Sequence, residues 1–550
     1  MREDLPRLSE AQRSAMLTGS DFFLKACPGA GKTRSVAARA ASLAEQGQHL
    51  ALLSYTRVGA REIADAVVRD FGVPLGDAHF IGTLHSFLVR YVLRPFGHLV
   101  TGSAVPMAID NEAMIAAMPP GLKAGDFQCD ASGTLVRVRR LQTHPDELDL
   151  VGRARSSLAR SGIVGFTDAV SISLQVLLRF PDVAMALTQR FDEILVDEAQ
   201  DTSDLLLRSL RAIKDAGLRS LVLVGDYDQA IYEFNGSLPE GCEKLARDVG
   251  LATRELRENF RSSQLICNMT ATVRGDSTPD IAAGPDRDVT IPPTLVKYAP
   301  GTHPDLPARF LEILTAHGIS ASDAAILVRN RDFAAQLEGI VRPAVPSTFS
   351  ELMSAASTVT PSMETFQGLE DLIVRRTFGN SSRPAGLDRM LVRSAAVQLL
   401  RSLPALRGDL HDWGVSAVAE LDRVAKALSP VTTSKLAPIN PPAHWKGTPA
   451  DYFIARAPNQ LEITTIHGAK GRSIDAVMLV AQVPAESFHT PNATAWSEAI
   501  ADPSAPKVEE LRLGYVALTR AKRLAVLAIP NDTRQQVVDR WLRAGFAMAE

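Results

Sequence analysis

The sequence predicts an α/β fold with two parallel-sheet domains in tandem, each interrupted by a mainly helical insertion. Short apolar segments alternate with helical segments, which is typical of parallel sheets covered by helices on both faces. These segments fall into two sets that lie far apart in the chain. Two long intervals, each close to the length of a small domain, interrupt the sets.

The predicted strands and helices follow from the apolar pattern. Residues 21–26 form a short apolar run, which predicts a buried strand, and residues 32–46 are rich in Ala, Arg and Glu, which predicts a helix. The other predicted strands are 51–56, 194–196 and 221–224 in the first sheet and 324–328, 476–480 and 524–529 in the second.

These sets predict how the chain divides into domains. The first α/β domain is expected at 1–90 and 186–262, and its insertion at 91–185. The second α/β domain is expected at 263–345 and 456–550, with a compact insertion at 346–455.

Composition excludes several classes of protein. The 550 residues are 46% hydrophobic and 22% charged, which is ordinary for a globular chain and excludes a disordered or collagen-like one. With 59 basic and 62 acidic residues the net charge is −3, so a nucleic-acid site should be a local groove. The four cysteines form no C-x-x-C pair, which argues against zinc or iron–sulfur sites. With no long apolar run, we expect a cytoplasmic protein without membrane contact.

A glycine-rich turn lies between the first predicted strand and the following helix. It matches the phosphate-binding pattern G-x-x-x-x-G-K-[ST] except for an alanine in the first position. Backbone N–H groups of such a turn surround phosphate oxygens at a helix N-terminus. The turn therefore predicts a nucleotide site made by Ala26, Cys27, Pro28, Gly29, Ala30, Gly31, Lys32 and Thr33.

Two carboxylates follow the apolar run at 194–196. Asp197 is expected to hold Mg²⁺ together with the Thr33 hydroxyl, and Glu198 to polarise an attacking water. An acidic pair can also cap the next helix, because helix N-termini favour negative charge. Because the same chain also contains the glycine-rich turn, the catalytic interpretation of these carboxylates is favoured.

Several motifs together resemble superfamily 1 helicases of the UvrD/Rep/PcrA type. They occur in the family's order and span nearly the whole chain. The motifs are L-S-E-A-Q at 8–12, D-E-A-Q-D-T at 197–202, V-G-D-Y-D-Q-A-I-Y at 224–232, E-N-F-R-S at 258–262, T-T-I-H-G-A-K-G at 464–471 and G-Y-V-A-L-T-R-A at 514–521.

The resemblance implies two RecA-like domains that bind ATP and Mg²⁺ between them. It implies that Gln12 reads adenine and that Gly471 contacts the nucleotide. It also implies that Arg261 and Arg520 act as arginine fingers, and that Gln229 links the γ-phosphate to the DNA groove. Because Arg520 belongs to the second domain, catalysis is expected to require closure of the two domains.

The resemblance further implies single-stranded DNA across both sheets, held by hydroxyls, amides and aromatic stacking. The implied contacts are Tyr55, Thr56, Thr83, His85, Phe234, Thr465 and His467. Three residues depart from the family pattern: Asn235 replaces an arginine, and Arg472 and Ser473 replace Leu-Glu.

Two functions remain open at this point. The first is an ATP-dependent helicase and translocase that moves 3′ to 5′ and acts at single-strand/duplex junctions. The second is a DNA-end-sensing ATPase that signals to a partner nuclease or repair protein. The compact insertions and the run at 80–96 resemble the helicase-like subunit of the Gabija antiphage system, which favours the second.

Overall fold

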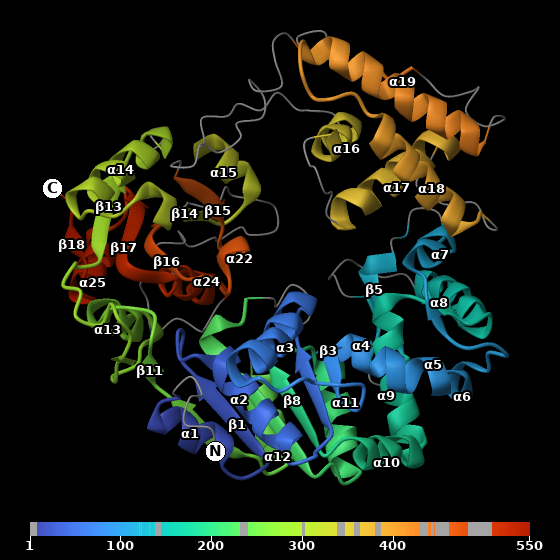
Figure 1. Cartoon of the computed structure of the whole chain (residues 1–550), viewed down its shortest axis with the longest axis horizontal. Coiled ribbons are helices and arrows are strands. Elements are labelled where there is room, and N and C mark those ends of the chain that lie inside the picture. Colours follow the sequence, from blue (N-terminus) through green and yellow to red (C-terminus); the bar gives the residue numbers. More distant parts are fainter. Residues whose placement is uncertain are drawn as a thin grey trace.

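The computed structural model contains two six-stranded sheets, and every strand pair within them is parallel. Figure 1 shows these sheets as separate lobes, with the two insertions beside them. This confirms the predicted α/β class. The structure describes residues 8–119, 122, 124–130, 132–137, 145–231, 240–299, 303–337, 347–356, 363–379, 387–429, 438–441, 445, 461–481 and 509–549.

The first sheet has the strand order β10-β1-β9-β8-β2-β3. Its strands are β1 (Phe22–Ala26), β2 (Leu50–Ser54), β3 (Phe80–Thr83), β8 (Glu193–Asp197), β9 (Ser220–Gly225) and β10 (Ala252–Leu256). Successive residues of β1 enter different buried clusters, with Leu24 on one face and Phe23 on the other. Both faces are thus covered, which explains the nearly continuous apolar runs of the central strands.

Helices on both sides cover the first sheet (Figure 1). They are α1 (Glu10–Leu17), α2 (Lys32–Glu45), α3 (Arg57–Phe71), α11 (Asp204–Asp215) and α12 (Gly241–Asp248), with the 3₁₀ turns η3 (Ala199–Asp201) and η4 (Tyr227–Gln229). A glycine in the left-handed conformation ends α3, with a φ of 67° at Gly72. Glycine adopts this conformation without steric cost, so the helix ends there.

The first insertion is mainly helical, as predicted. Its helices are α4 (Leu84–Leu88), the π-helix η1 (Val89–Leu93), α5 (Arg94–Phe96), α6 (His98–Thr101), α7 (Asn111–Ala116), α8 (Pro145–Arg160), α9 (Phe166–Arg179) and α10 (Pro181–Arg190). Two small strand pairs accompany them: β4 (Ala108–Ile109) with β7 (Ile163–Val164), and β5 (Phe127–Cys129) with β6 (Leu135–Arg137).

The second sheet has the order β15-β14-β16-β17-β13-β18. Its strands are β13 (Thr294–Tyr298), β14 (Ala324–Val328), β15 (Glu462–Thr465), β16 (Ile474–Val480), β17 (Ala521–Pro530) and β18 (Ala547–Met548). Its helices are α14 (Leu306–Ala316), α15 (Arg331–Leu337), α22 (Ile466–Ala469), α24 (Glu509–Leu518) and α25 (Gln535–Arg543).

Four helices form the described part of the second insertion and pack around one apolar core that includes Phe349, Trp413 and Trp445. They are α16 (Ser347–Ala356), α17 (Met363–Phe378), α18 (Arg389–Ser402) and α19 (Leu410–Leu428). No single described helix is long and apolar enough to cross a membrane. One sharply bent pair, α9 with α10, passes the same length and composition test. The predicted domain boundaries stay predictions.

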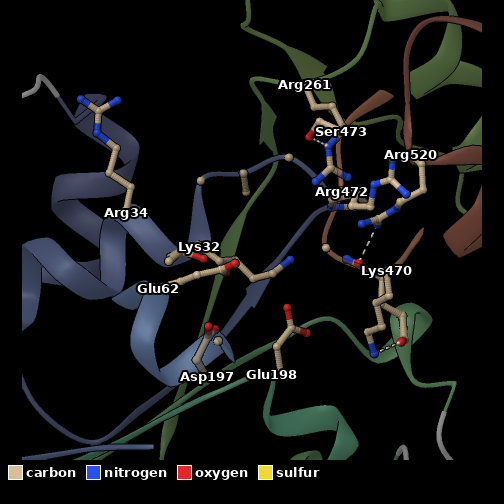
Figure 2. A pocket seen from close by; sticks show the side chains of 18 of the residues that line it. Lys32, Arg34, Glu62, Asp197, Glu198, Arg261, Lys470, Arg472, Ser473 and Arg520 are labelled. Carbon is tan, nitrogen blue, oxygen red and sulfur yellow. Dashed lines mark hydrogen bonds between the residues drawn. The ribbon is translucent and has the colours of Figure 1, made fainter. Parts of the chain in front are cut away.

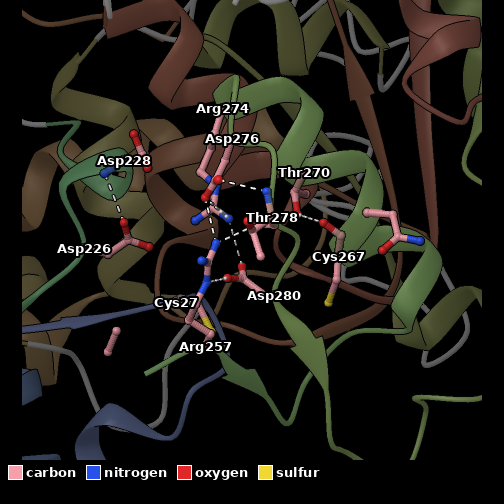
Figure 3. Close-up of polar contacts among 12 residues, drawn as sticks. Cys27, Asp226, Asp228, Arg257, Cys267, Thr270, Arg274, Asp276, Thr278 and Asp280 are labelled. Atoms are coloured by element: carbon pink, nitrogen blue, oxygen red, sulfur yellow. Dashed lines mark hydrogen bonds and ion pairs between the residues drawn. The ribbon is translucent and has the colours of Figure 1, made fainter. Parts of the chain in front are cut away.

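The connection between the sheets is held by a network of ion pairs (Figure 3). The connecting segment contains β11 (Glu258–Asn259), α13 (Gln264–Arg274) and β12 (Ile281–Ala282). The guanidinium of Arg257 lies 2.8 Å from the Asp276 carboxylate, and that of Arg274 lies 3.4 Å from the Asp280 carboxylate. Because α13 packs into the core of the second sheet, this network fixes the direction in which the chain leaves the first sheet.

Candidate functional site

A cavity of about 770 Å³ lies between the two sheets, at the carboxyl ends of β1 and β8. Ligand pockets in parallel α/β proteins form at this edge of the sheet. In Figure 2 the Lys32 side chain lies on one side and Arg261 and Arg520 on the other, with Asp197 and Glu198 nearby. The residues implied as fingers therefore share one cavity with the phosphate-binding turn.

The glycine-rich turn has the backbone that phosphate binding requires. Gly29 and Gly31 have φ values of 76° and 72°, in the left-handed region. A Cβ atom on Gly29 would lie 2.4 Å from the Asn259 side chain, so glycine is required there for space as well. Residues 28–33 line the cavity at the N-terminus of α2, whereas Ala26 and Cys27 are buried. The Lys32 Nζ donates to the carbonyls of Ala26 and Cys27, at 3.2 and 3.3 Å.

Helix α1 brings Gln12 to the turn. The Gln12 Nε2 donates to the Ala30 carbonyl at 2.9 Å, and Ser9 begins the helix with a capping box that includes Gln12. Two arginines hold the other end of α1. Arg39 donates to the Met16 carbonyl and Arg254 to the Ala15 carbonyl, both at 2.7 Å. The position of Gln12 therefore depends on both ends of this short helix.

The two predicted carboxylates lie at the end of β8. Glu198 has a backbone φ of 52°, a value that residues other than glycine rarely adopt. The Gln200 amide donates to its carboxylate and fixes its orientation. Burial raises the pKa of Glu198, but the charges of Lys32 and Lys470 outweigh it and hold the pKa below its ordinary value. Glu198 is thus ionised at neutral pH, as activation of water requires.

Asp197 has the properties of a metal ligand. Burial, together with the neighbouring charge of Glu198, raises its pKa to about 7. Its Oδ1 is buried and has no hydrogen-bond partner within the part of the chain that the structure describes. A buried carboxylate oxygen without a donor is satisfied by a bound cation, so Asp197 and the nearby Thr33 hydroxyl fit Mg²⁺. The described residues contain no cluster of three or more His, Cys, Asp or Glu that could hold a metal.

Two guanidinium groups enter the cavity, Arg261 from the segment that connects the sheets and Arg520 from directly before β17 of the second sheet. The Arg520 Nη2 donates to the Gln229 Oε1 at 2.9 Å, and the Gln229 Nε2 donates to the Asp226 carboxylate at 2.7 Å. Arg261 donates to the Ser473 hydroxyl at 2.8 Å and to the Thr519 carbonyl at 2.9 Å. Burial, and then the charge of Arg520, lowers the pKa of Arg261 to about 9, which still leaves it charged at neutral pH.

Lys470 is a further residue of the cavity, to which the sequence motifs assigned no role. Its Nζ pairs with the Asp201 carboxylate at 2.6 Å and donates to the Gln229 carbonyl at 3.0 Å. Burial raises the pKa of Asp201 to about 7, against the lowering effect of Lys470. Lys470, next to Gly471, and Asp201, next to Gln200, both lie inside motifs that the sequence shows. Their opposite charges are the signal that could have indicated the ion pair.

The departure after Gly471 has a structural role. Arg472 pairs with Glu462 at 2.6 Å, and Ser473 is the residue that accepts the hydrogen bond from Arg261. Gly471 lines the cavity with them. Ser473 thus helps to position Arg261 in this chain. Asn235 and Phe234 lie outside the described residues.

The threonines predicted to contact DNA all begin helices. Thr83 and Thr465 are the last residues of β3 and β15, and Thr56 lies two residues after β2. Each hydroxyl accepts a hydrogen bond from the first turn of the next helix. Tyr55 and Thr56 also line the large cavity. These positions place helix N-termini, exposed at Thr56 and half-buried at Thr83 and Thr465, along the carboxyl edges of both sheets, where phosphates are favoured.

The two predicted histidines have different surroundings. His467 lies in the cavity lining, with its Nε2 3.2 Å from the Ile231 carbonyl. His85 stacks on Phe166, with ring centroids 4.5 Å apart, and burial lowers its pKa to about 4. Phe166, the first residue of α9, was missed because a lone aromatic gives no pattern in the sequence, yet its side chain is 46% exposed.

Comparisons with known proteins agree with this geometry. A family model of the UvrD/REP helicase N-terminal domain matches residues 8–132 and 137–250, and a model of the UvrD-like helicase C-terminal domain matches 417–530. ATP-dependent DNA helicase UvrD1 of Mycobacterium leprae is 27% identical over 307 residues, which cover 49% of this chain and 39% of that protein.

Two other relatives show the same extent of similarity. ATP-dependent DNA helicase Rep of Escherichia coli is 24% identical over 47% of this chain and 42% of its own length. ATP-dependent DNA helicase PcrA of Bacillus subtilis is 25% identical over 46% of this chain and 37% of its own length. The matched region spans about two fifths of each relative. With two family models in the expected order and two parallel sheets around one cavity, the chain belongs to the UvrD-type superfamily 1 helicases.

Proposed function

We propose that this chain is a DNA-dependent ATPase that moves 3′ to 5′ along single-stranded DNA and unwinds duplex at single-strand/duplex junctions. The observation that carries the proposal is the shared cavity, in which the phosphate-binding turn faces Arg520 from the other sheet. A nucleotide bound there would contact both lobes. Its hydrolysis and release would therefore change the separation of the lobes and move the DNA held across them.

The first sheet would bind the triphosphate and activate water. Lys32 and the backbone of the turn would bind phosphate oxygens, while Thr33 and Asp197 would hold Mg²⁺, which neutralises phosphate charge when bound. Glu198, ionised and fixed by Gln200, would orient the attacking water and accept its proton.

Arg261 from the connecting segment and Arg520 from the second sheet would complete the site on closure. Arg261 and Arg520 would stabilise the charge that develops on the γ-phosphoryl group, and such a group is worth roughly 10³–10⁵ in rate. Gln229, which already bridges Arg520 and Asp226, would report the presence of the γ-phosphate. Gln12 and Gly471 would contact the adenosine part.

Single-stranded DNA would lie along the carboxyl edges of the sheets. Helix N-termini at Thr56, Thr83 and Thr465 would bind its phosphates, and Tyr55, His85 and His467 would add contacts. Phe234 stays an expected stacking residue. We add the exposed ring of Phe166, which extends the His85 contact into the first insertion. The proposal keeps the domain boundaries expected from the sequence.

A second candidate is a DNA-end-sensing ATPase that activates a partner nuclease, as in a Gabija-like defence complex. The compact second insertion favours it, since its described helices form one small core around Phe349 and Trp413. A sensor needs ATP turnover at a DNA end but no strand separation.

Three assays on the same protein test the proposal. The first measures ATP hydrolysis with and without single-stranded DNA, and stimulation by DNA is expected. The second measures displacement on 3′-tailed and 5′-tailed duplexes, and only the 3′-tailed duplex should be unwound. The third measures translocation on single strands. Translocation on single strands without displacement of duplex would favour the DNA-end-sensing ATPase. A rate of ATP hydrolysis that DNA does not change would contradict both candidates. Glu198→Gln is the matched control that should bind ATP without turnover.

A further inference from the structure

A short segment of the first lobe is bonded to the second lobe through three successive carbonyl groups. The Gln229 carbonyl accepts from the Lys470 Nζ at 3.0 Å, and the Ala230 carbonyl accepts from the Arg512 Nε at 2.7 Å. The Ile231 carbonyl lies 3.2 Å from the His467 Nε2. All three partners lie in or directly after α22 and α24, which pack against the second sheet.

Packing agrees with these bonds. Gln229 is 4% exposed, and Ala230 and Ile231 are fully buried. Ile231 belongs to the same apolar cluster as Ile466, Leu513 and Leu527, which is the core of the second lobe. The segment 229–231 follows β9 of the first sheet and keeps a bond to that lobe, from the Gln229 amide to Asp226. The apolar surroundings of Ile231, however, are those of the second lobe. A rigid-body movement of the second lobe should therefore carry this segment with it.

Arg512 is the donor that lies away from the nucleotide cavity. Its side chain is buried, with 2% exposure, and its guanidinium lies 6.0 Å from the centre of the Tyr227 ring. It is absent from the lining of the nucleotide cavity, whereas Lys470 and His467 are part of it. Burial of a guanidinium is costly, so its retention at a backbone carbonyl calls for a specific role.

The position of this segment affects the nucleotide site through the side chain of Gln229. This side chain accepts from Arg520 and donates to Asp226, so its amide orientation depends on where the backbone at 229–231 lies. A shift of about 1 Å in a positioned group can lower a rate by about a hundredfold. We propose that Arg512 is a positioning residue that fixes the Gln229–Ile231 segment to the second lobe, so that Gln229 and Arg520 approach the γ-phosphate as one unit. This inference rests on the proposed ATPase function.

Two substitutions separate the hydrogen bond from the rest of the side chain. Arg512→Gln keeps a nitrogen donor at the position of Nε, four bonds from Cα along the side chain, and removes the charge. Arg512→Met has similar length and no donor. We expect Arg512→Met to lower the DNA-stimulated kcat about tenfold or more with little change in KM for ATP, and Arg512→Gln to stay within about threefold of the unsubstituted chain. Equal kcat in the Met and Gln variants would overturn the proposal.

A double-substitution cycle tests whether Arg512 acts through Gln229. Gln229→Ala combined with Arg512→Met should be no slower than Gln229→Ala alone, because the group that Arg512 positions is already absent. Effects that multiply would show that Arg512 acts independently of Gln229 and would overturn the proposal. Melting temperatures of all variants show whether they fold, and Arg512→Gln keeps the test open if the Met variant does not.

Hydrogen–deuterium exchange gives a readout that does not depend on activity. Arg512→Met should speed exchange of the backbone amides at 226–231, and Arg512→Gln should not. Unchanged exchange in the Met variant would contradict the inference. If the unsubstituted chain hydrolyses no ATP, the proposed function fails, while the exchange result still decides whether Arg512 holds this segment.

Discussion

The guanidinium of Arg520 donates a 2.9 Å hydrogen bond to the side-chain oxygen of Gln229, and the two residues belong to different lobes. This bond lies beside the cavity that holds Lys32 and Glu198. It links the group that would stabilise the transition state to the segment that leaves the central strand β9. In the proposed mechanism, closure of the lobes would therefore also complete the nucleotide site.

Lys32→Ala and Glu198→Gln should each abolish DNA-stimulated ATP hydrolysis and leave the fold intact. Lys32 provides the charge for the phosphates, and Glu198 is the ionised carboxylate next to the metal position. Steady-state ATPase assays with circular dichroism spectra check both points. Turnover that persists in both variants would contradict the assigned site. Lys25→Ala is a matched control, because this lysine pairs with Glu243 away from the nucleotide cavity.

Phe166→Ala should weaken binding of single-stranded DNA by about 1–3 kcal/mol, because an exposed aromatic face is lost. Phe166→Tyr keeps the face and should bind nearly normally. Fluorescence anisotropy with a labelled oligonucleotide measures both affinities, and nucleotide affinity should not change in either variant. Equal DNA affinity for the Ala and Tyr variants would remove Phe166 from the DNA path.

His85 should make the protein less stable at acidic pH. Burial lowers its pKa in the folded state to about 4, against an ordinary value of 6.5. Below 6.5 the unfolded chain therefore binds a proton that the folded chain excludes, so stability falls as pH falls from 6.5 towards 4. Between pH 7.5 and 5 the loss is about 2 kcal/mol.

Urea unfolding at these two pH values, compared between the unsubstituted chain and His85→Gln, isolates this contribution. Glutamine does not titrate, so the variant should lose less stability on acidification. An identical loss in both proteins would show that His85 does not sense the pH.

Arg39→Met should destabilise the first lobe by about 3–5 kcal/mol, because it leaves the buried Glu193 without a charged partner. The two groups lie 2.6 Å apart, with side-chain exposures of 4% and 2%. Chemical denaturation measures the loss. The double variant with Glu193→Gln should recover much of it, since no buried charge is then left unpaired. A single variant as stable as the unsubstituted chain would contradict this account.

The central strands could be predicted from the sequence because they are buried on both faces and read as apolar runs. The strand at 324–328 has the predicted bounds, and β8 and β9 extend the prediction by one residue at each end. The four edge strands β3, β10, β15 and β18 were not predicted. β10 is exposed along most of its length, so its sequence carries no apolar run. β13 was also not predicted, although its residues are apolar.

The residues of the site could be predicted where they lie together in one short motif. They could be predicted less well where segments far apart in the sequence come into contact. The turn at 26–33 and the pair Asp197 and Glu198 are local in the sequence, and residues 28–33 line the same cavity as that pair. Arg512 and Ala230 are 282 positions apart, and no local pattern links them. Their contact exists only because α24 packs against η4.

The most direct test of the central claim is single-turnover ATP hydrolysis by Arg520→Ala with single-stranded DNA, measured beside the affinity for a non-hydrolysable ATP analogue. If Arg520 completes a site whose other half is the first lobe, the rate should fall roughly 10³–10⁵-fold while the affinity changes far less. A normal rate, or a loss confined to affinity, would contradict the claim that the two lobes share one triphosphate.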